Sequence, residues 1–135
     1  HGIIVFPGGV GTAEEILYLI GILSHPDNKG NPYPFIMTGP KSAEDYFKKI
    51  DEFIRFALGD EVTKLYEIII EDPEKVAKQM VKGLRKVKKY RTLNQISYYF
   101  DWNLKIEDTF QFPFIPTHEN MLNLNLNQSQ PVNQL

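Results

Sequence analysis

The sequence predicts an α/β fold: the carboxyl half of a doubly wound, Rossmann-like parallel sheet, followed by a carboxyl-terminal extension. Strand and helix patterns alternate three times between residues 1 and 90, which is the order of a parallel sheet with helices on both faces. The first predicted strand is a continuous apolar run, as expected for a strand covered on both faces. We therefore expect two parts, residues 1–90 and residues 91–135.

The first strand is predicted over residues 3–6, where four apolar residues precede Pro7. A strand of this buried type needs parallel neighbours and a right-handed crossover before it. Because only His1 and Gly2 precede the strand, we expect the sequence to be a fragment cut within a doubly wound domain.

A glycine-rich loop follows this strand, and an apolar helical pattern begins after Thr12. Gly8, Gly9 and Gly11 have no Cβ, so the backbone there can adopt left-handed angles and approach a ligand closely. With Val10 and Thr12, they would present the free N–H groups of the first helical turn, which favour an anion. The loop is therefore a candidate phosphate-binding site.

Two better-known glycine loops do not fit the spacing. A P-loop needs a lysine directly after its last glycine, but Thr12 and Ala13 follow Gly11. A dinucleotide-binding loop needs a small residue where this sequence has Glu14. One alternative stays open, namely a plain α/β turn whose Glu14 and Glu15 complement the helix dipole.

The helix predicted over residues 12–23 is apolar almost all round, so we expect it to be buried on every side. Gly21 costs such a helix about 1 kcal/mol relative to alanine. Its presence suggests close approach by another backbone, with a subunit interface as one candidate. Residues 24–31 are rich in helix breakers and form a loop, in which we expect His25 to be solvated.

Two further strands and two further helices complete the pattern. In order, they are a strand over 33–38, a helix over 42–58 begun by Ser42 and ended by Gly59, a strand over 66–70 and a helix over 73–88 begun by Asp72.

The spacing of apolar residues in the second helix predicts a core stripe of Tyr46, Ile50, Phe53 and Ala57. The carboxyl ends of strands line the ligand crevice of an open α/β sheet. Thr38, Gly39 and Lys41 are therefore expected on the same rim as the glycine loop, where turn formation and substrate contact are equally good explanations for them.

Composition narrows the function classes. The chain has 135 residues, 42% of them hydrophobic, and a formal net charge of −2, so no global charge attracts nucleic acid or an anionic membrane. The absence of cysteine excludes disulfides and thiolate metal sites, and it suits the reducing cytoplasm. The longest strongly apolar stretch, residues 16–23, is far shorter than the ~20 residues that span a bilayer. The three histidines are widely separated, so no metal site is expected.

The loop meets an ordered pattern, Pro-Gly-Gly-x-Gly-Thr-x-x-Glu, through Pro7, Gly8, Gly9, Gly11, Thr12 and Glu15. This pattern resembles the signature of the "Lonely guy" phosphoribohydrolases, often labelled lysine decarboxylases, and of the related bacterial nucleotide 5′-monophosphate nucleosidases. Residues 98–106 and 114–121 are similar to stretches of the carboxyl-terminal region that only the nucleosidases carry, so the extension is expected to be family-specific.

The resemblance implies hydrolysis of the N-glycosidic bond of nucleoside 5′-monophosphates to free base and ribose 5-phosphate. It also implies a homo-oligomer and a nucleotide effector, and no cofactor. Cleavage develops positive charge at the sugar, which a carboxylate stabilises. We assign Glu14 to the sugar and the catalytic water, and Glu15 to orienting the loop or sharing that role. The family also uses an arginine upstream of the motif, and that part of the domain is absent from this sequence. Because half of the sheet is missing as well, we expect the chain alone to be inactive and poorly folded.

Two other functions are weighed against this one. The first is a non-catalytic module that binds a nucleotide or cofactor through the same loop. The second is the decarboxylase label, which would require a lysine placed to form a Schiff base, and no lysine lies near the loop in the sequence.

In the extension, the alternation of apolar and polar residues over 98–106 predicts a half-buried strand. Leu122, Leu124 and Leu126 show a shorter strand-like alternation. His118 and Glu119 are candidates for a polar contact with substrate or with a neighbouring subunit.

Overall fold

A computed structural model describes residues 1–97, 104–107, 111–124 and 129–130. Most of the strand predicted over 98–106 lies outside these residues, and the described part, residues 104–106, is not a strand. Leu126 also lies outside them.

The structure alternates strands and helices in the predicted order. The main elements are β1 (Ile3–Val5), α1 (Val10–Ser24), β2 (Phe35–Gly39), α2 (Glu44–Leu58), β3 (Glu67–Ile70), α3 (Pro73–Leu93) and α4 (His118–Leu122). Short 3-10 helices lie between them, η1 (Pro26–Asn28), η2 (Lys41–Ala43) and η3 (Asp60–Leu65).

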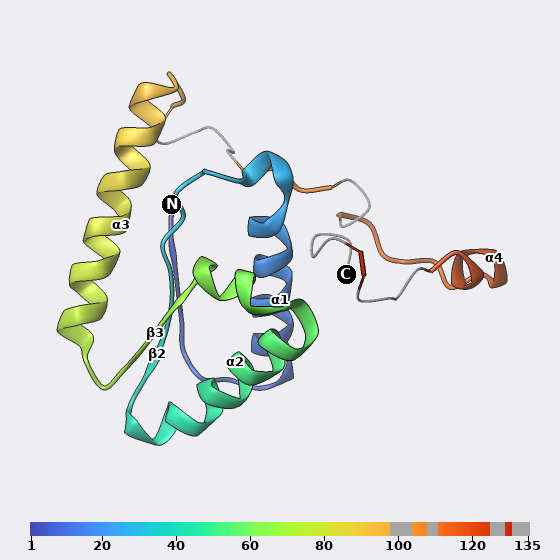
Figure 1. Cartoon of the computed structure of the whole chain (residues 1–135), viewed down its shortest axis with the longest axis horizontal. Helices are drawn as coiled ribbons and strands as arrows, with labels where there is room; N and C mark the ends of the chain where they lie inside the picture. The colour runs from blue at the N-terminus through green and yellow to red at the C-terminus, as the bar shows by residue number, and fades with distance from the viewer. Residues whose placement is uncertain (98–103, 108–110, 125–128, 131–135) are drawn as a thin grey trace.

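The three strands form one parallel sheet in the order β1-β2-β3, with Ile4 opposite Ile36 and Ile36 opposite Glu67. Helices α1 and α2 cover one face of this sheet and α3 covers the other (Figure 1). The predicted parallel sheet with helices on both faces is therefore confirmed for the described residues.

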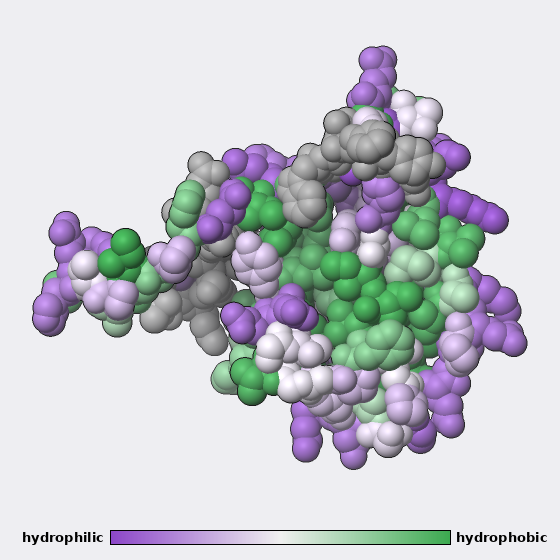
Figure 2. Space-filling model, turned by 180° about the vertical axis from the view of Figure 1, so that it is seen from behind, coloured by the Kyte–Doolittle hydropathy of each residue, from purple (hydrophilic) through white to green (hydrophobic). Residues whose placement is uncertain are grey.

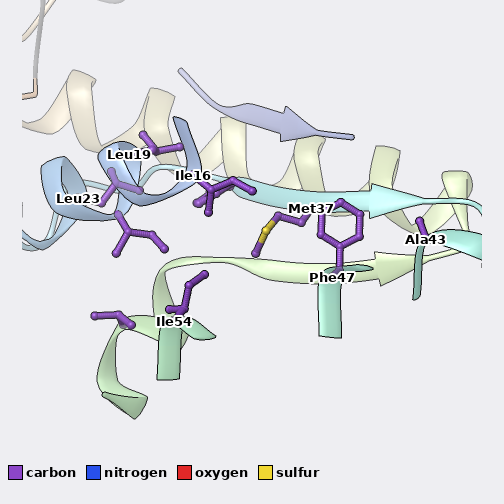
Figure 3. Packing of buried hydrophobic residues seen from close by; sticks show 10 residues of the cluster. Ile16, Leu19, Leu23, Met37, Ala43, Phe47 and Ile54 are labelled. Carbon is purple, nitrogen blue, oxygen red and sulfur yellow. The ribbon is translucent and has the colours of Figure 1, made fainter. Parts of the chain in front are cut away.

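The larger core lies between the sheet and the helices α1 and α2. Ile16 and Ile20 of α1, Met37 of β2, and Phe47 and Ile54 of α2 are its largest fully buried side chains. Figure 3 shows side chains from α1, β2 and α2 directed into this common space. The apolar faces of both helices are therefore buried against β2, the central strand.

The opposite face carries a smaller core and one close contact with α3. Ile36, Ile69 and Val76 form the buried cluster there. Gly83 of α3 lies so near Pro34 that a Cβ on Gly83 would come within 2.5 Å of the Pro34 Cβ. The absence of a side chain at residue 83 thus lets α3 approach the start of β2.

The predicted burial of the first strand is wrong in this structure. Strand β1 spans only Ile3–Val5 and forms an edge of the sheet, so Ile4 is 40% exposed and Phe6 is 63% exposed. Figure 2 shows a broad hydrophobic area on the rear face of the molecule. An edge strand has only one neighbour to cover it, which explains the exposure of this apolar run.

Helix α1 is less enclosed than predicted. Its buried residues are Ile16, Leu19, Ile20, Ile22 and Leu23, while Tyr18 is exposed. Outside the neighbouring backbone of α1, no described atom lies within 4 Å of a Cβ built on Gly21, so no other backbone among the described residues approaches Gly21 closely.

In α2 the predicted start and core stripe need correction. Ser42 lies inside η2, and the residue before α2 is Ala43, which offers no capping side chain. Phe47 and Ile54 are fully buried, whereas Phe53 is exposed. The residues 47, 50 and 54 also follow three- and four-residue spacing, so periodicity alone did not distinguish the two adjacent rows.

Other helix boundaries agree with the chemistry of their ends. Gly59 follows α2 with a positive φ of 85°, as predicted for a glycine that ends a helix. Asp72 caps α3 by accepting a hydrogen bond from the Lys75 N–H at 2.8 Å.

In the extension, Leu122 ends the helix α4 and is not part of a strand, contrary to the alternation pattern. Helix α4 is capped by the Thr117 side chain, which accepts a hydrogen bond from the Asn120 N–H. Among the described residues, no helix has both the length and the apolar character needed to cross a bilayer.

Candidate functional site

The glycine loop connects the end of β1 to the start of α1, at the carboxyl edge of the sheet. The helix begins at Val10, with Gly9 as its N-cap, two residues earlier than the apolar pattern suggests. The Ala13 N–H donates the first helical hydrogen bond to the Gly9 carbonyl at 3.3 Å. Val10, Gly11 and Thr12 therefore form the first turn, whose N–H groups have no acceptor within the helix.

The glycines of the loop do not use the left-handed backbone angles that are open to glycine. Among the described glycines, only Gly30 and Gly59 have positive φ, and Gly9 is extended with φ −89° and ψ −155°. No described atom lies within 4 Å of a Cβ built on Gly9 or Gly11. These two glycines therefore leave open space above the N–H groups.

Gly8 has a different role in the loop. A Cβ on Gly8 would lie 2.1 Å from the Thr12 Oγ1 and 2.8 Å from the Thr12 Cβ. The chain before α1 thus folds back against the side chain of Thr12. Gly8 allows the compact loop, while Gly9 and Gly11 leave it accessible.

Glu14 and Glu15 are both exposed and lie beyond the first turn of α1. A helix that began at residue 12, as predicted, would place both glutamates in its first turn, but the helix begins at Val10. The two residues are consecutive in α1, so their side chains leave the helix about 100° apart around its axis. Helical side chains generally lean towards the N-terminus of the helix, which is the end where the loop lies.

The end of β2 contacts the loop directly. A Cβ on Gly39 would lie 3.1 Å from the Pro7 Cγ and 2.8 Å from the Ala43 Cβ. The Gly39 carbonyl accepts a hydrogen bond from the Glu71 N–H at 2.9 Å. Glu71 follows β3 and has a positive φ of 61°. The three strand ends therefore meet on one rim, with Gly39 at its centre.

Lys41 lies on this rim, two residues after Gly39. Its Nζ is 2.6 Å from the Glu44 Oε2, and the hydrogen bond to Glu44 raises the pKa of Lys41. A lysine that forms a Schiff base needs a lowered pKa. The rim thus contains a lysine, but its charged form is the stabilised one.

His25 is buried, not solvated as expected. The Asp27 N–H donates to His25 Nδ1 at 3.1 Å, so Nδ1 must be the unprotonated nitrogen. His25 Nε2 then donates to the Glu107 Oε1 at 2.5 Å. This contact joins residues 82 positions apart, and no local pattern in the sequence indicates it.

A second polar cluster missed by the sequence pattern joins α2 to the start of β3. Arg55 Nε donates to Asp51 Oδ2 at 2.7 Å, and Tyr66 Oη donates to Asp51 Oδ1 at 2.6 Å. Burial disfavours the charged form of Asp51, but the hydrogen bonds from Arg55 and Tyr66 outweigh it and lower its pKa. Burial, followed by the hydrogen bond to Asp51, raises the pKa of Tyr66. These groups stabilise the fold and lie outside the glycine loop.

His118 and Glu119 begin the short helix α4 and are exposed. Within the described part of the chain, no cluster of three or more histidine, aspartate or glutamate side chains is arranged to hold a metal ion.

Comparisons with known proteins divide the chain into two matching regions. Residues 1–80 match the family model described as "Possible lysine decarboxylase". Residues 84–135 match the model described as "Pyrimidine/purine nucleotide monophosphate nucleosidase, C-terminal". Both match boundaries fall within α3.

Three curated relatives carry the description "Pyrimidine/purine nucleotide 5′-monophosphate nucleosidase". They come from Escherichia coli strain K12, from strain O6:H1 and from O157:H7, and each is 51% identical over 135 residues. The alignment covers 100% of this chain but 30% of each relative. The chain therefore spans less than a third of the length of these relatives.

Proposed function

This chain belongs to the family described as possible lysine decarboxylases, and from that premise we propose that it is part of a nucleotide 5′-monophosphate nucleosidase. The proposed reaction is hydrolysis of the N-glycosidic bond of a nucleoside 5′-monophosphate, giving free base and ribose 5-phosphate. The observation that carries the proposal is the open first turn of α1 with two carboxylates beyond it. The 51% identity to curated nucleosidases supports the same reaction.

In this proposal the 5′-phosphate binds at the amino end of α1. The N–H groups of Val10, Gly11 and Thr12 would donate to its oxygens, and the helix dipole favours its negative charge. Gly8 and Gly9 complete the loop around the phosphate. This binding serves the ground state and the transition state alike, so its contribution is to fix the ribose relative to the carboxylates.

The glutamates supply the chemistry. As the glycosidic bond breaks, its electron pair leaves with the base, and positive charge develops at C1′ and the ring oxygen. We assign Glu14 to stabilising that charge and accepting a proton from the attacking water, with Glu15 orienting the loop or sharing this role. The water oxygen forms the new bond to C1′, and the proton that Glu14 takes up then passes to the departing base, so that the base leaves neutral, Glu14 is ionised again and no cofactor is needed.

The deciding experiment assays ribose 5-phosphate release by the full-length protein from a panel of nucleoside monophosphates. We expect release by the wild type and a loss of about 100-fold or more in Glu14→Gln, Glu15→Gln or both, the scale of general acid–base catalysis. Glu52→Gln, an exposed glutamate on α2, is the matched control and should retain full activity. Wild-type rates in both loop variants would refute the assignment.

A non-catalytic nucleotide-binding module is the second candidate, and the same assay separates it. Such a module would bind the monophosphates without releasing ribose 5-phosphate. The decarboxylase alternative is disfavoured by Lys41, the lysine on the rim, because its pairing with Glu44 raises its pKa.

The resemblance also supports three wider proposals. We propose that the full-length enzyme is a cytoplasmic homo-oligomer that responds to a nucleotide effector. We further propose that residues 1–90 form the second half of the nucleotide-binding domain and residues 91–135 the start of the carboxyl-terminal extension. All of these proposals concern the full-length protein.

A further inference from the structure

The segment 104–107 of the carboxyl-terminal region lies across the end of α1. In Figure 1 this short orange segment passes beside the end of α1 that leads into η1. Leu104 packs against the core that α1 shares with β2 and α2. The segment, called the strap below, thus contacts a part of the chain almost 80 residues earlier.

Asn28 holds the backbone of the strap. Its Nδ2 donates to the Lys105 carbonyl at 2.8 Å, and its Oδ1 accepts from the Lys105 N–H at 2.6 Å. The side-chain amide therefore pairs with both backbone groups of one residue, as a neighbouring strand would. Asn28 is 3% exposed, so both bonds are largely shielded from water.

The same amide also completes the end of α1. Asn28 Nδ2 donates to the Ile22 carbonyl at 2.7 Å. Ile22 is one of the last residues of α1, where carbonyls have no N–H donor within the helix, and its carbonyl also accepts a hydrogen bond from the His25 N–H at 3.1 Å. Asn28 thus satisfies the helix end and the strap together, which accounts for a buried polar residue in an otherwise irregular turn.

His25 adds a second contact to the strap, a hydrogen bond to a carboxylate. With Nδ1 accepting from the Asp27 N–H, the ring presents an Nε2–H to the Glu107 carboxylate. His25 is itself buried. The turn therefore offers a fixed donor for the side chain of residue 107 beside a fixed amide for the backbone of residue 105.

The two sides of this contact belong to the two matching regions. The turn lies in the region that matches the possible lysine decarboxylases, and the strap lies in the nucleosidase carboxyl-terminal region. We propose that His25 and Asn28 form a docking site that attaches the carboxyl-terminal region to the α/β domain, in addition to the covalent connection through α3. In this site, Asn28 binds the backbone of residue 105. His25 binds the carboxylate of residue 107, two positions later.

The test is hydrogen–deuterium exchange of the full-length protein, read at the amides of the strap. In Asn28→Ala we expect these amides to exchange at least about fivefold faster, since each lost hydrogen bond contributes about 1 kcal/mol. Peptides covering β2 and α2 should exchange as in the wild type. Lys105→Ala is the matched control and should leave the strap protected, because Lys105 binds through its backbone and its side chain is exposed.

A variant on the strap itself separates docking from folding of the α/β domain. Lys105→Pro removes the N–H group that donates a hydrogen bond to Asn28 Oδ1, and it changes no residue of the α/β domain. We expect the amides of residues 106 and 107 to exchange faster than in the wild type. The amides of the α/β domain should exchange at the wild-type rate. Unchanged strap exchange in both Asn28→Ala and Lys105→Pro would overturn the proposal. So would equal acceleration of the strap and of β2, because Asn28 would then support only the fold.

Discussion

At the level of single residues, the glycines of the loop differ in what they permit. Gly8 is required by contact with Thr12, whereas Gly9 and Gly11 face open space. At Gly8 the absence of a side chain is therefore needed for packing. At Gly9 and Gly11 it leaves room for a ligand. Each position can be tested by adding a single methyl group.

We expect the Gly11→Ala variant to keep the fold and to bind the substrate more weakly. Because Gly11 is helical and unobstructed, alanine should raise stability by up to about 1 kcal/mol. A methyl group beside the proposed phosphate should raise KM by about tenfold, the effect of losing roughly 1.4 kcal/mol of binding. Thermal melts and steady-state kinetics of the full-length enzyme measure both. An unchanged KM would place the phosphate elsewhere.

A second residue-level prediction concerns Asp51. Its pKa is lowered in the folded protein, so the stability that it contributes is present above its ordinary value of 3.8 and is lost as the pH falls through the folded pKa. Asp51→Asn should therefore destabilise the protein by roughly 1 kcal/mol near pH 7 and by less near pH 3, which lies below the ordinary pKa of 3.8. Melting temperatures at both pH values measure this, with Glu52→Gln as the exposed control.

Were Asp51→Asn to cost as much at pH 3 as at pH 7, the charge of Asp51 would not be the source of its contribution.

At the level of elements, two helical glycines show how packing decides the effect of one substitution. Gly21 lies within α1 and Gly83 within α3. A Cβ on Gly21 meets no described atom within 4 Å, whereas one on Gly83 lies 2.5 Å from the Pro34 Cβ. Helix propensity is the same at both positions, so any difference comes from the neighbouring element.

We expect Gly83→Ala to destabilise the protein by about 1–3 kcal/mol, because α3 must move away from Pro34. Gly21→Ala should instead stabilise the fold of each subunit of the full-length protein by up to about 1 kcal/mol. Chemical denaturation of both variants measures the difference in their free energies of unfolding. Equal effects would show that the contact of α3 with Pro34 is easily relieved.

Gly21→Ala also tests the proposed homo-oligomer. If the backbone of a second subunit approaches Gly21, the added methyl group should weaken subunit association in the full-length protein while leaving the monomer fold intact. Sedimentation at several protein concentrations measures the association, and an unchanged oligomer would exclude a subunit contact at Gly21.

For the molecule as a whole, the exposed edge formed by β1 is the main reason to expect that the chain produced alone associates with other copies. Ile4 and Phe6 on this edge are exposed, and Val10 beside it is 87% exposed. The relatives are more than three times as long as the aligned region, which leaves ample chain to cover such an edge in a protein of that length. An uncovered apolar edge strand favours association over a stable monomer.

We therefore predict that the 135 residues produced alone are inactive and lack a cooperative, concentration-independent thermal transition. Calorimetry at two protein concentrations and the ribose 5-phosphate assay test this. A sharp, reversible melt at both concentrations would contradict the prediction and would show that the core around α1 and α2 is sufficient for folding.

The sequence alone determined the order of strands and helices, the parallel α/β class and the position of the glycine loop. These features rest on local signals: apolar runs, helix periodicity, and the capping by Asp72 and Gly59, which act within a few residues. The tertiary structure alone decided that β1 lies at an edge, that α1 starts at Val10, and that His25 is buried. Those outcomes depend on which distant residues meet, as Glu107 meets His25, and contacts between residues far apart leave no periodic trace in the sequence.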